Sequence, residues 1–500
     1  MINKIVFEDE ITVWWDKVFD FPSDGEFVVF MDGKACGRTK KTHYTLKGLR
    51  ENTAYEIAVS AVDGSGSELE TLDRVSLKTL KKKKRLDVTK EPYCAVGDGV
   101  TLNTAALQKA FDDCKAGECV YFPSGVYLTG ALNVGSDTEI YLEKNAVLQG
   151  TGYVEDYLPK RKSRFEGIEM ECYSSLINMG ELDRFGGYNC QNVVIRGGGT
   201  ISGGGELLSA AIIETERERL REFLQKNKKY VAQCENENTL PGRARGRLVN
   251  MSNCKNVVFS GVTLQYGPSW NVHFVYSKDI VTCGCRIVSQ GVWNGDGWDP
   301  DSSEDCTVFD TEFFTHDDSI AIKSGKNPEG NVINRPTKNV KIFDCRGRNG
   351  IAIGSEMSGG IDGVYIWDCD FSSSYSGLYI KTTRKRGGYV RNVCVNDSKF
   401  VSVSVFSELT YNNDGESAAE LPKVENIAVE NVELTGTRVF ADGETENLDC
   451  IELFGLEEAA YHLENVKFKD VRLRYRKNGE QVMKLRSVKN LTLENINFIN

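Results

Sequence analysis

A short phrase that recurs along the chain constrains its fold more than any other feature. An asparagine is followed by alternating apolar residues, a polar break and a second alternating run, from about residue 191 onward. The intervals from Asn339 to Gly363 to Asn392 are 24 and 29 residues, and solenoid repeats have periods of about 20–50 residues. The phrase starts at seven asparagines, with degenerate copies at Cys306 and Gly363: Asn192, Asn256, Asn339, Asn392, Asn426, Asn465 and Asn490.

The alternation inside each phrase has a period of two, which is typical of strands and excludes helical and leucine-rich repeats. We therefore predict an all-β chain in which residues 88–500 form a right-handed parallel β-helix. Its coils would stack about 4.8 Å apart, so that residues one coil apart in sequence become neighbours in space. Residues 210–233 depart from the pattern, because their helical spacing and mixed charges predict an inserted helix.

The first 80 residues have a different pattern. Short alternating strands are expected at 11–15, 26–30, 55–59 and 75–79, which predicts a small β-sandwich over residues 1–80. The run from Leu49 through Tyr55 to Val59 resembles the signature of a fibronectin type III module. The basic residues Lys81 to Arg85 that follow can be a nucleic-acid patch, but between two folded segments they favour a solvated linker, assigned to 81–87.

Composition limits the classes of partner and cofactor. A formal net charge of −11 argues against nucleic acid, and there is no apolar run of about 18 residues that would predict a membrane span. The first residues lack the apolar run of an export signal, and the 15 cysteines show no CxxC spacing. We expect reduced core thiols, a cytoplasmic location, no metal and no cofactor. A homo-oligomer is compatible with the sequence.

Three aspartates are the strongest candidates for chemistry. Asp296 and Asp317 are 21 residues apart, close to one coil, so they are expected on adjacent rungs at one edge, with Asp318 beside them. Carboxylates so close cannot all ionise easily, so one should keep its proton and serve as an acid while another serves as a base. Glycoside hydrolysis with inversion uses such a pair at about 6.5–9.5 Å. The alternatives are a polar ladder at the turns or a calcium site.

Four segments resemble, in order, the four motifs of the polygalacturonase family, glycoside hydrolase family 28. They are Asn-Gly-Asp-Gly from Asn294, His-Asp-Asp from His316, Asn-Gly-Ile-Ala-Ile-Gly from Asn349, and Tyr-Ile-Lys-Thr from Tyr379. The resemblance covers about 88–500 and implies a pectin lyase-like β-helix. It also implies an inverting hydrolase of pectic oligosaccharides. The stretches 299–303 and 354–360 resemble exo-acting bacterial members, which implies exo-removal of galacturonic acid or a related uronide.

The resemblance also implies roles for individual residues. Asp317 matches the family's general acid, and Asp296 and Asp318 match the pair that holds and deprotonates the attacking water. Lys381 matches the lysine that binds the carboxylate of a galacturonate, and Asn294 belongs to the substrate-binding set.

The chain departs from the family at two positions. Asn349 stands where the third motif has a histidine, and Tyr379 stands where the fourth has an arginine. Three sites could compensate by binding substrate: His316, His273 and the basic run that starts at Arg384. Trp270 could in addition stack on a sugar face, with core packing as an equal interpretation. Surface or packing roles are the alternatives for the histidines and the basic run.

Other functions stay open at this point. The departures could indicate another sugar, such as a rhamnogalacturonan fragment or a different glycoside. They could also indicate a carbohydrate-binding protein without turnover. A β-helix lyase would need calcium and a lysine or arginine base. Each alternative predicts different products from a panel of pectic oligosaccharides.

Overall fold

The protein is described here by a computed structural model that covers residues 1–17, 21–22, 24–410, 414–474 and 482–499. The chain divides into two compact units, Met1–Lys84 and Arg85–Asn500. Each unit is described by itself. Among the helices in these ranges, none combines the length and hydropathy that crossing a bilayer requires.

The N-terminal unit consists of two antiparallel sheets, and each of the four strands expected from sequence overlaps a strand of the structure. Its core contains Val13, Trp15 and Phe27, all almost fully buried. One sheet has the order β1 (Asn3–Val6), β2 (Glu10–Trp14), β5 (His43–Lys47). The other has the order β4 (Lys34–Thr39), β3 (Glu26–Met31), β6 (Ala54–Val62), β7 (Glu68–Lys78).

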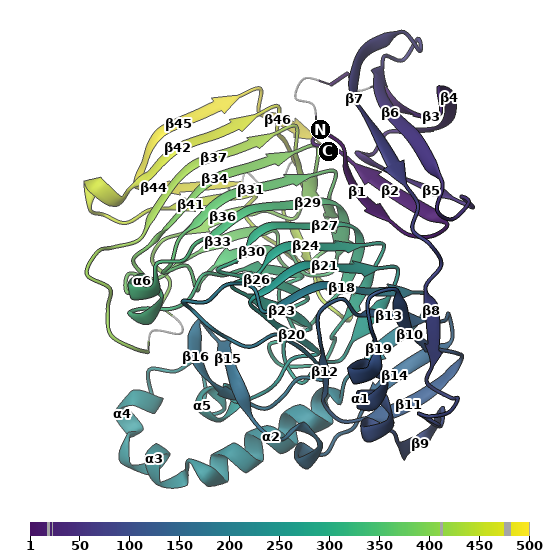
Figure 1. The fold of residues 1–500 in the computed structure, drawn as a ribbon. Helices are drawn as coiled ribbons and strands as arrows, with labels where there is room; N and C mark the ends of the chain where they lie inside the picture. Colours follow the sequence, from purple (N-terminus) through teal and green to yellow (C-terminus); the bar gives the residue numbers. More distant parts are fainter. Residues whose placement is uncertain (18–20, 23, 411–413, 475–481, 500) are drawn as a thin grey trace. The chain divides into compact units, whose positions relative to one another are not determined.

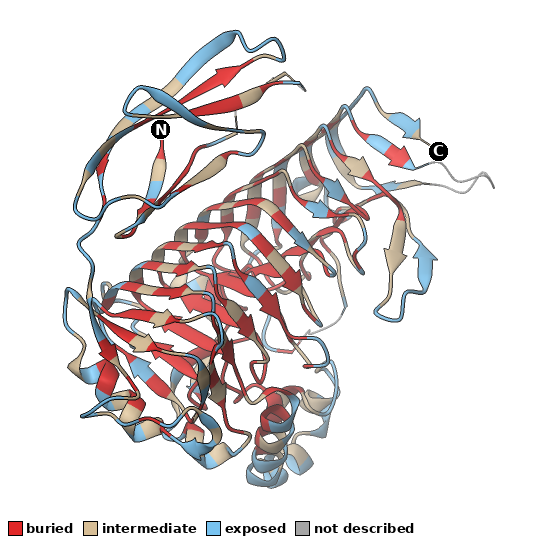
Figure 2. Cartoon of the chain, turned by 90° about the vertical axis from the view of Figure 1, so that its right-hand side faces the viewer, coloured by how far each residue is buried: buried red, intermediate tan, exposed pale blue. Residues whose placement is uncertain are grey.

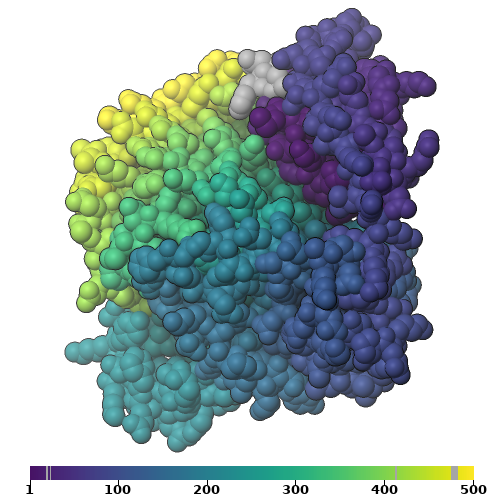
Figure 3. Space-filling view, in the orientation of Figure 1, coloured from purple at the N-terminus to yellow at the C-terminus, as the bar shows by residue number. Residues whose placement is uncertain are grey.

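The second unit is a right-handed parallel β-helix, as predicted. Its coils follow one another in chain order from β8 to β46 (Figure 1), and in the space-filling view the surface passes in the same order from blue through green to yellow (Figure 3). The strands form three ladders along the solenoid. The long strands β27 and β29 each belong to two of them.

The first ladder consists of β8 (Lys84–Asp87), β10 (Glu118–Phe122), β13 (Glu139–Leu142), β18 (Cys190–Gly197), β21 (Cys254–Ser260), β24 (Lys278–Cys283), β27 (Glu304–Phe314), β29 (Thr337–Gly347), β31 (Ile361–Trp367), β34 (Tyr389–Asn396), β37 (Lys423–Glu430), β42 (Leu463–Lys469) and β45 (Val488–Glu494). The second continues through β27 and β29 and adds β9 (Asp98–Leu102), β11 (Gly125–Thr129), β14 (Ala146–Gly150), β19 (Thr200–Ser202), β22 (Thr263–Gln265), β25 (Arg286–Val288), β32 (Asp370–Phe371), β35 (Lys399–Phe400), β38 (Glu433–Leu434), β43 (Arg472–Arg474) and β46 (Asn497–Ile499).

The third ladder, which positions the candidate site, is a sheet of its own. It consists of β12 (Leu132–Val134), β17 (Ile177–Met179), β20 (Val249–Ser252), β23 (Val272–Val275), β26 (Trp298–Asp301), β28 (Ile320–Ile322), β30 (Ile351–Gly354), β33 (Leu378–Lys381), β36 (Val403–Phe406), β41 (Ile451–Phe454) and β44 (Met483–Arg486).

The recurring asparagine is the third or fourth residue of a first-ladder strand and has left-handed backbone. Asn426 has φ 58°, and its side-chain amide donates to Asn392 Oδ1 at 3.1 Å while Asn465 donates to Asn426 Oδ1 at 2.9 Å. The copy read at Cys306 keeps the position as Asp305, with φ 55°, and the other copy uses Gly363, which adopts φ 83° freely. The phrase is therefore a ladder of hydrogen-bonded turns.

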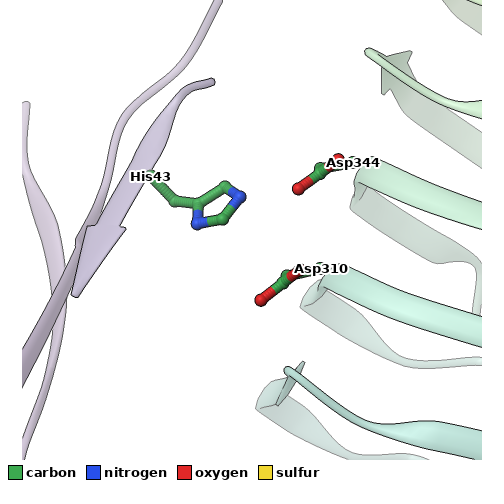
Figure 4. Close-up of side chains that lie close together, drawn as sticks. All are labelled: His43, Asp310 and Asp344. Atoms are coloured by element: carbon green, nitrogen blue, oxygen red, sulfur yellow. The ribbon is translucent and has the colours of Figure 1, made fainter. Parts of the chain in front are cut away.

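Left-handed backbone recurs at a second corner of the coils, within the long strands β27 and β29. Asp310 and Asp344 have φ values of 48° and 49° and occupy equivalent positions on neighbouring coils, with their side chains pointing outward (Figure 4). At the equivalent corner of later coils, the Asn495 side chain donates to Asp470 Oδ1 at 2.9 Å. Polar residues at these corners satisfy local groups, so they are structural in most coils.

The interior of the solenoid is one continuous apolar core. Figure 2 shows the buried residues along its strands, and Val257, Ile280, Cys306 and Val340 stack in register on four successive coils with no exposed surface. Each fully buried aliphatic side chain contributes about 1.5–3 kcal/mol. Ten of the 15 cysteines are buried, in line with the expected core thiols.

Several elements project from the coils. The insertion predicted at 210–233 is helical, but it starts at Gly205 and is broken at Leu220 and Asn227 into three helices. The helices are α1 (Thr104–Asp113), α2 (Gly205–Arg219), α3 (Arg221–Lys226), α4 (Lys228–Val231), α5 (Thr239–Gly242) and α6 (Glu329–Ile333), with 3₁₀ turns at Val154–Tyr157 and Ala459–Tyr461. Two hairpins are formed by β15 (Arg161–Phe165) with β16 (Ile168–Cys172) and by β39 (Thr437–Val439) with β40 (Thr445–Asn447).

The segment expected to be a linker, 81–87, is partly solenoid. Residues Lys84–Asp87 form β8, which pairs with β10. The difference has a physical reason: Leu86 is buried, and the Arg85 guanidinium lies 4.2 Å from the centre of the Tyr121 ring. A basic residue that covers an aromatic ring is not distinguishable by sequence from a solvated one.

Candidate active site

The three aspartates lie together on two adjacent coils of the third ladder. Trp298 pairs with Ile320, so the positions two residues earlier, Asp296 and Asp318, are stacked, and the Gly297 N–H donates to Asp318 O at 3.0 Å. The spacing of 21 residues from Asp296 predicts Asp317, not Asp318, at the position stacked on Asp296. The observed offset is 22, and Asp317 instead lies beside the stack.

The carboxylates differ in their surroundings. Asp296 is only 3% exposed, and its Oδ2 is 3.2 Å from the ammonium of Lys323. Asp318 Oδ2 accepts a hydrogen bond from Lys381 Nζ at 2.8 Å, and its backbone N–H donates to Asp317 Oδ1 at 3.0 Å. Asp317 itself lines a surface groove. Asp317 therefore lines the groove, and each of the other two carboxylates lies beside a lysine.

Burial governs the protonation of this cluster. Removal from water raises the pKa of Asp296 to about 8, with the nearby charges of Asp317 and Asp318 adding to the effect and Lys323 opposing it. Burial also raises the pKa of Asp318, which Lys381 partly offsets. The free protein thus holds a proton within the cluster at neutral pH, as a group of acids this close requires.

The third motif supports the loop that carries the aspartates. Asn349 is buried, its side-chain amide donates to Thr315 O at 2.9 Å, and its own carbonyl accepts from the Ser319 hydroxyl at 2.6 Å. Asn294 is likewise fixed, because its Oδ1 accepts from the Arg245 guanidinium at 2.6 Å. Asparagine at position 349 therefore has a defined scaffolding contact in place of a titratable ring.

The fourth motif lies one coil beyond the third and two coils beyond the coil of Asp317 and Asp318. Tyr379 pairs with Ala352 across β30 and β33, is partly buried, and meets Phe406 edge to face at 5.6 Å between ring centres. Lys381 from the same strand reaches back to Asp318. The expected carboxylate-binding lysine is thus near the carboxylates.

Of the candidates outside the expected carboxylate set, the structure places His316 in the groove lining but not His273, Trp270 or Arg384. His273 is fully buried 3.5 Å from Asp301, and burial lowers its pKa to about 4. Trp270 is 3% exposed and stacks on Phe165 at 4.6 Å, so it packs below the surface. Arg384 contacts carboxylates on an exposed loop. A resemblance between motifs carries no information on which side chains reach the surface.

The groove contains residues that the motifs did not indicate. It has a volume of about 1120 Å³ and runs from Asp317 along the ends of later coils. Glu235 comes from the helical insertion, which has no counterpart in the repeats, and Arg348 directly precedes the third motif. The further lining outside the motifs includes Trp293, Phe314, Asp370, Tyr375, Phe440 and Asp442. His316 and Asn349, which belong to the motifs, also line the groove.

Comparisons with known proteins agree on one family. The family model described as glycosyl hydrolases family 28 matches residues 161–494. A probable polygalacturonase of Vitis vinifera is 33% identical over 319 residues, which are 61% of this chain and 58% of the grape protein. An exo-poly-alpha-D-galacturonosidase of Dickeya chrysanthemi is 25% identical over 494 residues, covering 89% of this chain and 80% of that protein.

Solved structures extend the likeness. A hyperthermoactive exopolygalacturonase from Thermotoga maritima has a TM-score of 0.67 at 26% identity, covering 83% of this chain and 91% of that one. A family 28 exopolygalacturonase from Yersinia enterocolitica has a TM-score of 0.75 at 20% identity and covers 99% of this chain and 98% of that one, which supports the fold of both units.

Proposed function

The chain belongs to glycosyl hydrolases family 28, and on that premise we propose that it hydrolyses pectic galacturonan by direct attack of water, releasing uronic acid from a chain end. The observation that carries this proposal is the stack of Asp296 and Asp318 beside the groove-facing Asp317. The arrangement supplies a carboxyl that can touch the glycosidic oxygen and two that can hold water behind the sugar.

The acid must reach the leaving oxygen, and access favours Asp317 for that role. The raised pKa of Asp296 places a proton on the buried carboxyl in the free protein, which differs from this assignment. The three neighbouring carboxyls share this proton, so it can pass to Asp317 when the substrate contacts that side chain. Asp318 is then the base, since Lys381 at 2.8 Å favours its charged form.

Action at a chain end is supported by the similarity to the Dickeya exo-poly-alpha-D-galacturonosidase and the Thermotoga exopolygalacturonase. Glu235, in the loop after α4, lines the groove beside Asp317, and Arg243 anchors the neighbouring residues through contacts to Glu166 at 2.7 Å and Asp414 at 2.8 Å. This segment forms one wall of the groove.

The substrate proposed is an oligogalacturonide or a related uronide, recognised through Lys381 at the position where the family binds a carboxylate. We propose action in the cytoplasm, on imported fragments, because buried thiols such as Cys285 and Cys306 suit a reducing compartment. Cell fractionation with an antibody against the protein tests the location. A protein found outside the cytoplasm would contradict it.

For the N-terminal unit we propose a fibronectin type III-like module. Its sheets have three and four strands, and the Tyr55 hydroxyl accepts a hydrogen bond from the Arg50 N–H at 3.0 Å. A tyrosine that bonds to backbone a few residues upstream is a recurring feature of such sandwiches. A role in assembly or carbohydrate binding is testable by deleting the unit and measuring hydrolysis and mass in solution.

The direct test of the proposed reaction is product analysis. Wild type should release monomeric galacturonic acid from trigalacturonic acid, and Asp317→Asn should lower kcat by about 10²–10⁴-fold because general acid catalysis is lost. Asp112→Asn, an exposed aspartate on α1, is the matched control. Equal activity of wild type and Asp317→Asn would contradict the assigned acid. An unsaturated product would indicate a lyase.

A further inference from the structure

The groove beside Asp317 extends past the carboxylates. Its walls come from the ends of three successive coils and from the loop of the β39–β40 hairpin, in segments 313–317, 346–349, 370–375 and 439–443. The volume of about 1120 Å³ lies above the roughly 300–1,000 Å³ of pockets that hold drug-sized ligands. The groove therefore has room for more than one sugar ring.

The position of the acid identifies which side of the scissile bond the groove serves. Asp317 lines the groove, whereas Asp296 and Asp318 are not among its lining residues. An acid donates its proton to the oxygen of the leaving group, and water attacks from the opposite face of the sugar. A sugar in the groove thus lies on the leaving-group side.

The groove has one arginine whose charge is not engaged by a carboxylate. Arg346 is paired with Glu312, whereas the Arg348 side chain lies, among the described residues, against the face of Phe314, with 5.8 Å from the guanidinium to the ring centre. The ion pairs of the described residues do not include Arg348, although Asp370 and Asp442 also line the groove. Its side chain is exposed to the groove.

The backbone at this position is nevertheless fixed. The Arg348 N–H donates to Phe313 O at 3.1 Å, and the Arg348 carbonyl accepts from the Tyr375 N–H at 2.7 Å. Tyr375 also lines the groove, and its ring is held by the Arg438 guanidinium at 4.3 Å and by the edge of Phe440. The Arg348 guanidinium is a planar cation on a backbone held in place, so it can bind the carboxylate of a uronic acid. The neighbouring Tyr375 ring can pack against the apolar face of the same sugar.

We propose that Arg348 binds the carboxylate of a uronic acid unit on the leaving-group side and so makes the chain select an acidic leaving group. It would take over the clamp that the fourth motif lacks at Tyr379. The assignment of the groove to the leaving-group side of the substrate rests on the proposed function. The presence of a uronate site in the groove does not depend on turnover.

Two substrates separate this role from a structural one. Arg348→Ala should lower kcat/KM for trigalacturonic acid about 10- to 100-fold, the effect of losing a charge-assisted bond. It should leave hydrolysis of a galacturonide with a neutral nitrophenyl leaving group unchanged. Arg286→Ala is the matched control, because Arg286 also covers Phe314, at 4.7 Å, and is not among the groove-lining residues. Arg348→Lys should recover part of the loss, since charge returns without the fork.

Binding separates failure of this site from failure of the proposed reaction. Calorimetry of trigalacturonic acid with Asp317→Asn and with Asp317→Asn/Arg348→Ala should show weaker binding by the double variant. If the double variant binds more weakly but wild type does not hydrolyse trigalacturonic acid, the hydrolase proposal fails and the uronate site stands. Equal binding by both variants would overturn the site, as would an equal loss of rate on both substrates.

Discussion

Lys381 and Asp318 form the contact that most directly links charge to catalysis in this protein. The ammonium lies 2.8 Å from the carboxylate, and it opposes the burial that raises the pKa of Asp318. If Asp318 is the base, activity requires its anionic form, so the pKa of this one side chain sets the acidic limb of the pH profile.

We therefore expect Lys381→Met to move the acidic limb of kcat/KM to higher pH. Without the cation, the anion is less favoured, the pKa of Asp318 rises further, and a higher pH is needed to ionise it. The rate at the optimum should also fall by about tenfold or more, as a charge-assisted contact is lost. A pH–rate profile measures both effects, with Lys399→Met, an exposed lysine on β35, as control. A limb that stays in place would show that Asp318 is not the titrating base.

At the scale of the element, the asparagine ladder explains why each coil turns where it does. Asn426 combines left-handed backbone with hydrogen bonds to the coils on both sides, through Asn392 and Asn465. Alanine disfavours the left-handed backbone and has no side-chain amide. Glycine adopts the left-handed backbone freely but cannot form the side-chain hydrogen bonds.

Asn426→Ala should accordingly lower the free energy of unfolding by about 1–2 kcal/mol, and Asn426→Gly by less. Chemical denaturation of the two variants and of Lys423→Ala, an exposed residue on the same strand, measures the difference. If glycine and alanine were equally destabilising, backbone strain would not be the reason for the asparagine.

The same ladder shows what could be predicted from sequence. Turn asparagines and period-two alternation identify coils because both are local requirements, and the aspartates followed from coil spacing. The coil at β24 has Asp279, with φ 56°, at the asparagine position, and the recurring phrase does not include this coil. The offset of 22 residues, the burial of Trp270 and the groove position of Arg348 depend on how loops pack across coils, which no local pattern encodes.

For the molecule as a whole, the candidate site has a cost in stability. The pKa of Asp296 in the folded protein is about 8, against about 3.9 for an unperturbed aspartate. The folded state thus keeps a proton that the unfolded state releases between these values, so the free energy of unfolding falls as pH rises through that window.

Asp296→Asn removes this titration while keeping a neutral side chain. We expect the variant to be inactive but more stable than wild type near pH 8, by up to about 5 kcal/mol, with the gain vanishing near pH 4. Denaturation curves at the two pH values test the prediction. A variant that is less stable than wild type at both would show that Asp296 is ionised and stabilised by Lys323 in the folded protein.

The central claim is that water attacks directly, with Asp317 protonating the departing sugar. Proton NMR of trigalacturonic acid during the first minutes of reaction, before mutarotation, reads the configuration of the newly formed end. Wild type should produce the β-anomer first from the α-linked substrate, because a single displacement inverts the carbon. Initial appearance of the α-anomer would contradict the account, since it requires a covalent intermediate on one of the three aspartates.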